Sequence, residues 1–227
     1  MPDSFPKTMP SRVLLLGTDA SGKNHVASVW AKNLRQLGNT VELREGWLSQ
    51  RPNASPQAHQ KGRFAHHAEA LFLWLFPILR WFLPPILAWL IRRDLRRFKD
   101  SSNLVMVVSH KALRILAFTL GQRPGFQAKR HVPKYLQRTL TQLATTWGGA
   151  IWVLDVDARV RLTRIYQRIQ DGVDDPFDRY MVDSLPRSER IENSLVQIAK
   201  TFLGAQLLEN NQASDAELWQ AFLEGIG

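Results

Sequence analysis

Short apolar runs alternate with longer stretches of helical periodicity along this chain. The runs have the length and composition of strands. They occupy residues 12–16, 104–108, 150–154 and 205–208, and residues 40–44 alternate apolar and polar positions as a strand does. Between them, apolar side chains recur every three or four residues, as Val26, Trp30 and Leu34 do, which predicts helices that bury one face. The alternation predicts an α/β fold with a mostly parallel five-stranded sheet that binds ligands at the carboxyl ends of its strands.

One stretch interrupts this alternation. From Leu71 to Ile91 the chain is apolar on every side apart from Arg80, and a cluster of basic residues follows. The length approaches the ~20 residues of a membrane-spanning helix. Three prolines and a central arginine disfavour a straight span, because proline breaks a helix and a charge in the bilayer is costly. We therefore predict an inserted helical hairpin over residues 66–99, with two short helices joined near Pro84 and Pro85.

Three fates of the hairpin remain open from the sequence. Its helices are buried within the protein, packed against a second subunit in a homodimer, or laid on an anionic membrane surface through residues 68–99. The third fate is favoured by the cations that follow the apolar segment, since basic residues are attracted to anionic headgroups. They are Arg92, Arg93, Arg96, Arg97 and Lys99.

Other segments read as loops and caps. Residues 49–62 are polar and contain two prolines, which predicts a mobile loop, and residues 121–133 form a basic loop. A helix after the fourth strand carries Arg161, Arg164 and Arg168 at helical spacing, within a lid-like region that we place at 161–180. Asp155 and Asp157 precede that helix and are expected to cap it.

Composition narrows the range of partners. The 227 residues suit one domain, residues 1–227, and a formal net charge of +10 favours an anionic partner. Nucleic acid is the least favoured, because the basic residues cluster near the predicted phosphate site and lid without interleaved stacking aromatics. The chain has no cysteine, which excludes disulfides and thiolate metal sites. No signal peptide is visible, so we expect a cytoplasmic protein, peripheral at the inner face of a membrane if the hairpin binds lipid.

The first strand leads into a phosphate-binding motif. Residues 17–24 read Gly-Thr-Asp-Ala-Ser-Gly-Lys-Asn, between the strand and the first helix. In that context the backbone N–H groups and the helix N-terminus hold a polyphosphate, and Lys23 reaches its outer phosphates. Gly17, Ser21, Gly22, Lys23 and Asn24 are thus the predicted nucleotide-binding residues. A glycine-rich turn without a ligand is the alternative.

The eighth position of the motif departs from the pattern. Asn24 stands where a Ser or Thr hydroxyl normally binds magnesium. An amide oxygen binds hard cations too, so Asn24 is a weak candidate metal ligand.

The ordered motifs resemble those of thymidylate kinases and related P-loop nucleotide kinases, over about residues 12–208. The resemblance is carried by the phosphate loop with Asp19 inside it, Arg44-Glu45 closing the second strand, Leu154–Asp157 closing the fourth, and the arginine-bearing helix that follows. It implies a P-loop NTPase-type three-layer sandwich, ATP and Mg²⁺ as cofactors, and phosphoryl transfer to a nucleoside monophosphate.

The same resemblance implies roles for individual residues. Asp19, Lys23, Arg164 and Arg168 would act in catalysis, and Arg44 and Arg80 would bind the acceptor. His110 is not part of the family pattern; as a hydrogen-bond donor it is a further candidate for binding the acceptor phosphate, with a structural or surface role as the alternative. The third strand ends in Ser109-His110, where the family carries an Asp-Arg pair that acts on magnesium and the acceptor phosphate. Two functional hypotheses follow: an ATP-dependent kinase for a small anionic acceptor, or a non-catalytic NTP-binding module associated with a membrane or protein partner.

Overall fold

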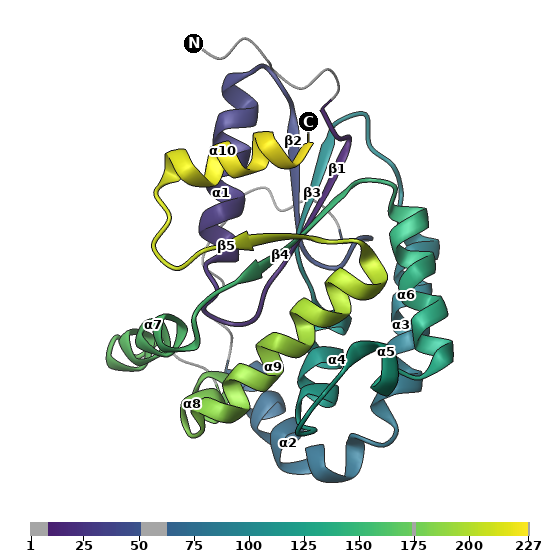
Figure 1. Ribbon diagram of the computed structural model, residues 1–227, viewed down its shortest axis with the longest axis vertical. Coiled ribbons are helices and arrows are strands. Elements are labelled where there is room, and N and C mark those ends of the chain that lie inside the picture. Colours follow the sequence, from purple (N-terminus) through teal and green to yellow (C-terminus); the bar gives the residue numbers. More distant parts are fainter. Residues whose placement is uncertain (1–8, 51–62, 174–175, 227) are drawn as a thin grey trace.

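The computed structural model describes residues 9–50, 63–173 and 176–226, which form a three-layer α/β fold (Figure 1). The sheet has the order β2-β3-β1-β4-β5, and every neighbouring pair is parallel. Its strands are β1 (Arg12–Leu16), β2 (Val41–Gly46), β3 (Leu104–His110), β4 (Ala150–Asp155) and β5 (Gln206–Glu209). The predicted fold class is confirmed, and the sheet is parallel throughout.

Helices cover both faces of the sheet. On one face lie α1 (Lys23–Gln36) and α10 (Asp215–Ile226). The other face is covered by α3 (Leu83–Arg97), α4 (Lys111–Gly121), α6 (Lys134–Trp147), α9 (Leu185–Ile198) and the π-helical turn η1 (Ala199–Leu203). The remaining helices are α2 (Arg63–Leu79), the short α5 (Ala128–His131), α7 (Ala158–Gln170) and α8 (Pro176–Val182).

Alternation along the central strands produces the two cores. In β1, Val13 and Leu15 point toward α1 and α10, whereas Leu14 and Leu16 point toward the opposite helix layer. Successive side chains of a strand face opposite sides of the sheet, so a strand covered on both faces must be apolar at every position. All seven residues of β3 are buried, and this explains why its sequence shows no alternation.

The hairpin turns at a different place from the one predicted. The break lies at residues 80–82, before the two prolines, and Pro84 and Pro85 stand in the first turn of α3. Proline is tolerated there because first-turn N–H groups have no partner within the helix. Pro77 lies inside α2.

The structure tests the predicted loop at 121–133 and the predicted cap of α7. The basic loop at 121–133 contains α5, and Asp157 caps α7 through a hydrogen bond from the Arg159 N–H at 2.8 Å. The predicted mobile loop at 49–62 falls mostly outside the described residues, as do positions 174–175 of the lid-like region.

Among the described residues, no single helix is long and apolar enough to cross a membrane. Residues 69–79 and 83–97 meet the length and composition criteria only when taken together, and the two helices are bent by 119° at their junction.

Candidate phosphate and acceptor site

The loop between β1 and α1 is tightly wound. Gly22 has φ 84°, in the left-handed region, and a Cβ atom there would lie 2.5 Å from Nδ2 of Asn210. Ser21 is fully buried, and its hydroxyl donates to the Thr18 carbonyl at 2.9 Å. Ala20 also has a positive φ, of 58°, which is uncommon for a residue with a side chain. Only glycine fits easily at position 22, so the motif glycine is explained by the fold.

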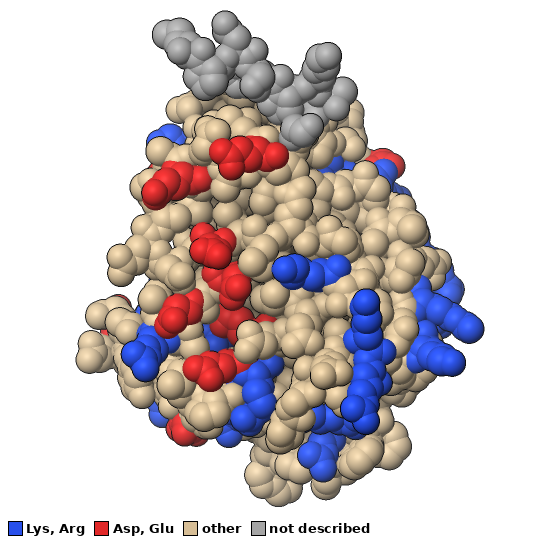
Figure 2. Space-filling view, viewed as in Figure 1, with Lys and Arg blue, Asp and Glu red and all other residues tan. Residues whose placement is uncertain are grey.

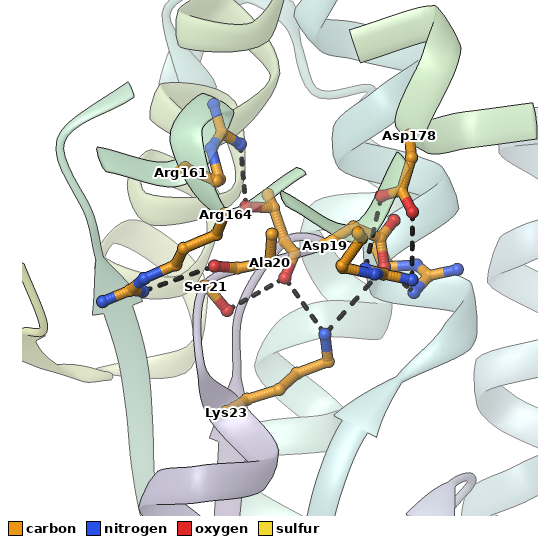
Figure 3. Close-up of polar contacts among 10 residues, drawn as sticks. Asp19, Ala20, Ser21, Lys23, Arg161, Arg164 and Asp178 are labelled. Atoms are coloured by element: carbon orange, nitrogen blue, oxygen red, sulfur yellow. Dashed lines mark hydrogen bonds and ion pairs between the residues drawn. The ribbon is translucent and has the colours of Figure 1, made fainter. Parts of the chain in front are cut away.

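The N-terminus of α1 has the features of an anion-binding site. No side chain caps the helix, and its first turn carries no acidic residue. The first N–H groups of a helix lack intrahelical partners and carry partial positive charge. Lys23 lies in this turn, 13% exposed, and its ammonium donates to the Thr18 carbonyl at 3.0 Å. Figure 3 shows the side chain of Lys23 directed from α1 toward the loop. Burial lowers the pKa of Lys23, and the nearby Asp19 carboxylate opposes that effect.

Three side chains hold the loop from outside. Arg161 is fully buried and donates to the Thr18 hydroxyl at 2.9 Å and the Ser188 hydroxyl at 2.6 Å. Arg164 donates to the Ala20 carbonyl at 3.3 Å, and Asn210 donates to the Ser21 carbonyl at 2.8 Å. Through these bonds α7 and the end of β5 fix the loop.

The buried charge of Arg161 has a partner. Glu192 on α9 lies 2.7 Å from it, so the two charges compensate each other in the core. Burial lowers the pKa of Arg161 and raises the pKa of Glu192 to about 7, against the attraction of the arginine.

A small cavity opens beside the loop. Its polar end is made by Thr18, Asp19 and Arg114, and the rest of its wall is apolar. The apolar side chains come from α4, α8 and α9: Ile115, Phe118, Phe177, Met181 and Ile191. Arg114 donates to the Asp19 carboxylate at 2.6 Å, while Lys23 lies 4.0 Å from the same carboxylate oxygen. One acid and two cations thus meet where the phosphate loop joins the cavity.

An ion pair links α7 to α8. The Arg168 guanidinium contacts both carboxylate oxygens of Asp178, at 3.3 and 3.0 Å. Asp178 is fully buried, whereas the side chain of Arg168 is 36% exposed. Phe177, next to Asp178, lines the cavity, so this pair orders the helix that forms part of the cavity wall.

The predicted residues fall into two groups. Gly17, Asp19, Ser21, Gly22 and Lys23 share the loop, and Arg164 contacts it. Arg44 makes its contacts elsewhere: it pairs with Glu42 at 2.6 Å and donates to the Leu48 carbonyl. Arg80 is exposed and lies over the Trp81 ring. The structure does not bring Arg44 or Arg80 to the cavity.

His110 belongs to a buried network. Its Nε2 lies 3.1 Å from the Asp94 carboxylate, which also accepts from the Leu48 N–H and from Ser49. Burial raises the pKa of Asp94, but the hydrogen bonds from His110 and Ser49 outweigh it and hold the pKa below its usual value. These contacts give His110 a structural environment, fastening α3 to the turn after β2.

Asn24 and Ser109 occupy the two positions that are linked to magnesium in the family pattern. Asn24 is exposed in the first turn of α1. Ser109 has φ 62°, and the pairing of β2 with β3 shifts register beside it. No group of three His, Asp or Glu side chains suited to a metal occurs within residues 9–50, 63–173 and 176–226. The hydroxyl and strand-end carboxylate of the family pattern are not supplied here, so we assign no step to a metal.

Two important residues were missed from the sequence. Arg114 lies in the first turn of α4. The only signal in the sequence was its position four residues beyond the end of the third strand. Arg161 was grouped with Arg164 and Arg168 as one basic face, yet it is buried. The sequence signal for its burial was its position one helical turn before the apolar Ile165, which places both side chains on the same face of α7.

Comparisons with known proteins find similarity only to solved structures of low sequence identity. No family model and no curated protein match the chain. A shikimate kinase from Acinetobacter baumannii in complex with shikimate is 16% identical, with 96% of this chain and 93% of that chain covered, at a TM-score of 0.42. A deoxyadenosine kinase from M. mycoides with bound dATP is 8% identical, with 94% and 97% covered, at 0.45.

A thymidylate kinase from Ehrlichia chaffeensis is 13% identical, with 96% and 97% covered, at a TM-score of 0.41. Identities and TM-scores this low leave the activity of this chain to be argued from its own site.

Proposed function

We propose that this protein transfers a phosphoryl group from ATP to a small anionic acceptor, most simply a nucleoside monophosphate. The observation that carries the proposal is the cavity that opens on the phosphate loop at Asp19 and Arg114. A loop that only bound a nucleotide would need no second pocket beside its phosphate end. Here Asp19 belongs to the loop and also lines the pocket, and Arg114 of α4 pairs with it there.

The donor side fits the phosphates of ATP. The uncapped N-terminus of α1 supplies N–H donors, and Lys23 is already buried beside them. The Lys23 ammonium now donates to a backbone carbonyl, and exchanging that contact for a phosphate oxygen would gain a charge-assisted hydrogen bond. Magnesium, when bound to ATP, would neutralise phosphate charge. Asn24 is the chain's nearest candidate ligand for it at the helix start.

The acceptor side fits a body with an apolar face. Phe118 and Phe177 stand edge to face, with ring centroids 5.4 Å apart, in the cavity wall. Aromatic walls with a few polar groups at one end are typical of sites for planar ligands. Arg114 would receive the anionic group of the acceptor and point it toward Lys23.

The transfer follows from this placement. An oxygen of the acceptor attacks the γ-phosphorus, the bond from that phosphorus to the β–γ bridging oxygen breaks, and ADP leaves. An acceptor phosphate brings no proton to remove; an acceptor hydroxyl would give its proton to Asp19. Phosphoryl transfer depends mainly on alignment and charge neutralisation, which Lys23, Arg114 and Arg168 are placed to provide.

The test is ADP formation with a panel of nucleoside monophosphates, with and without magnesium, and identification of the product by mass spectrometry. Arg114→Gln should lower kcat/KM by about a hundredfold, as the loss of one charge-stabilising donor does. Arg138→Gln, an exposed arginine on α6, is the matched control and should leave turnover unchanged. ATP binding without acceptor-dependent ADP formation would replace this proposal with the non-catalytic NTP-binding module.

A further inference from the structure

The α2–α3 hairpin is apolar on two faces. Its inner face is buried: Phe76 packs against Phe118 of α4, and Leu87 and Ile91 belong to the core beneath the sheet. These contacts account for one side of each helix. An ordinary surface helix would carry polar residues on the opposite side.

The outer face carries large apolar side chains instead. We define it by seven residues whose exposed fraction ranges from 48 to 75%. They are Leu71, Trp74, Ile78, Trp81, Phe82, Ile86 and Trp89. In the described part of the chain nine large apolar side chains are at least 48% exposed, and these seven lie within nineteen consecutive positions. Such a concentration marks an interaction site, because scattered exposure would be ordinary.

The outer face has cations beside it and no exposed acid. Arg80 lies over the Trp81 ring at 5.3 Å, and Arg93 lies over the Trp89 ring at 5.1 Å. Between Leu71 and Lys99, all of which the structure describes, the single acidic residue is Asp94, and it is buried. A partner of this face therefore meets arginines that no exposed acidic residue between Leu71 and Lys99 offsets.

We propose that the outer face docks into the headgroup region of an anionic membrane without spanning it. Three of its seven residues are tryptophan, which favours the boundary between lipid and water. Arginines beside them keep their charge at the lipid phosphates while their stems cover apolar surface. The 119° bend between the helices suits a pair lying at the interface.

Charge favours lipid over a second copy of the chain. Two copies joined through their outer faces would present Arg80 and Arg93 to a surface with no exposed acidic residue. An anionic bilayer supplies the missing negative charge, at about 1 kcal/mol per basic residue near its surface.

The described residues leave the outer face accessible. The hairpin turn lies at the lower end in Figure 1, with the start of β1 and the end of α10 at the upper end. On the side of the molecule in Figure 2, Lys and Arg gather on the right and lower parts, while Asp and Glu lie mainly on the left. At the lowest part of that view, where Figure 1 places the hairpin turn, Lys and Arg are visible and Asp and Glu are not.

Flotation with lipid vesicles tests the proposal, using the full chain without ATP so that the outcome is separate from that of the kinase assay. We expect binding to vesicles in which about a third of the phosphatidylcholine is replaced by phosphatidylglycerol, and much weaker binding to phosphatidylcholine alone. Leu71→Ser/Ile78→Ser should lower binding roughly tenfold or more, because it removes two apolar anchors.

Leu37→Ser/Val173→Ser is the matched control. Its residues are 45 and 61% exposed, against 55 and 66% for the test pair, and they lie outside the hairpin. Circular dichroism should report folded protein for both. Equal binding by the two variants would overturn the proposal. So would a lipid-free dimer that Leu71→Ser/Ile78→Ser dissociates while wild type fails to float, because the face would then bind a second copy.

Discussion

Lys23 is the side chain on which nucleotide binding depends most directly. Its ammonium is held at the loop by one carbonyl and by a carboxylate 4.0 Å away. In the proposed function ATP binds the folded protein only, so a concentration of about 100 Kd should stabilise it by about 2.7 kcal/mol. We predict that Lys23→Ala removes most of the resulting shift in Tm. Lys32→Ala, an exposed lysine on the same helix, should retain it in the same thermal-shift assay; an intact shift in Lys23→Ala would disprove the phosphate-loop assignment.

Asn24 sets the expected metal dependence. Its exposed amide replaces a hydroxyl, so we predict weak or unusual magnesium dependence of ATP binding and turnover. Asn24→Thr should restore the hydroxyl and tighten binding of magnesium–ATP, measured by calorimetry against metal-free ATP. Ordinary magnesium dependence in the wild type, with a neutral or harmful substitution, would contradict this interpretation.

Glu192 should make stability depend on pH. Burial raises its pKa from 4.5 to about 7, so between these values the folded protein binds a proton that the unfolded chain lacks. That contribution to stability is present at low pH and is lost as the pH rises through about 7. We predict that the free energy of unfolding of the wild type, relative to Glu192→Gln, falls between about pH 5 and 8, by at most about 1.4 kcal/mol per pH unit.

Urea unfolding over that pH range measures the difference. Glu189→Gln, an exposed glutamate on the same helix, is the control, and its difference from the wild type should stay flat. A flat difference for Glu192→Gln as well would mean that Arg161, 2.7 Å away, keeps the buried carboxylate ionised throughout.

At the scale of elements, both faces of α2 carry large apolar side chains, but only the buried face should contribute to the free energy of unfolding. Phe76 is 5% exposed and packs against Phe118 and Phe72, whereas Trp74 is 75% exposed. We predict that Phe76→Ala lowers the free energy of unfolding by about 3–5 kcal/mol, because it leaves a cavity. Trp74→Ala should change it by no more than about 0.5 kcal/mol. Urea titration of both variants checks this, and equal losses would mean that the outer face is covered in solution.

The sequence predicted elements better than their contacts. Apolar runs, and for residues 40–44 an alternating pattern, were sufficient to predict all five strands, because these patterns are local to each segment. The turn of the hairpin was misplaced, since Pro84 and Pro85 are compatible with both a break and a first turn of helix. Arg161 and Arg114 could not be assigned, because the burial of one and the pairing of the other with Asp19 depend on helices distant in the chain.

At the scale of the whole molecule, we expect binding to anionic vesicles to depend more on where the positive charges lie than on the net charge. The net charge of +10 alone predicts attraction to any anionic surface. The structure adds that Arg80 and Arg93 lie over tryptophan rings of the outer face, while the one acidic residue between Leu71 and Lys99 is buried. Attraction by the net charge and attraction by the cations beside the outer face are two explanations of vesicle binding. They differ in which arginines should weaken binding when substituted.

Two double variants separate them, since each removes two positive charges. Arg80→Gln/Arg93→Gln should weaken binding to phosphatidylglycerol vesicles by about fivefold for each arginine, as expected for charges held at the bilayer surface. Lys32→Gln/Arg159→Gln changes exposed residues of α1 and α7 and should leave binding near that of the wild type. Salt should weaken binding of the wild type more than that of Arg80→Gln/Arg93→Gln, because screening acts on the charges that remain. Equal losses in both variants would assign the attraction to net charge, and the docking surface would lose its electrostatic support.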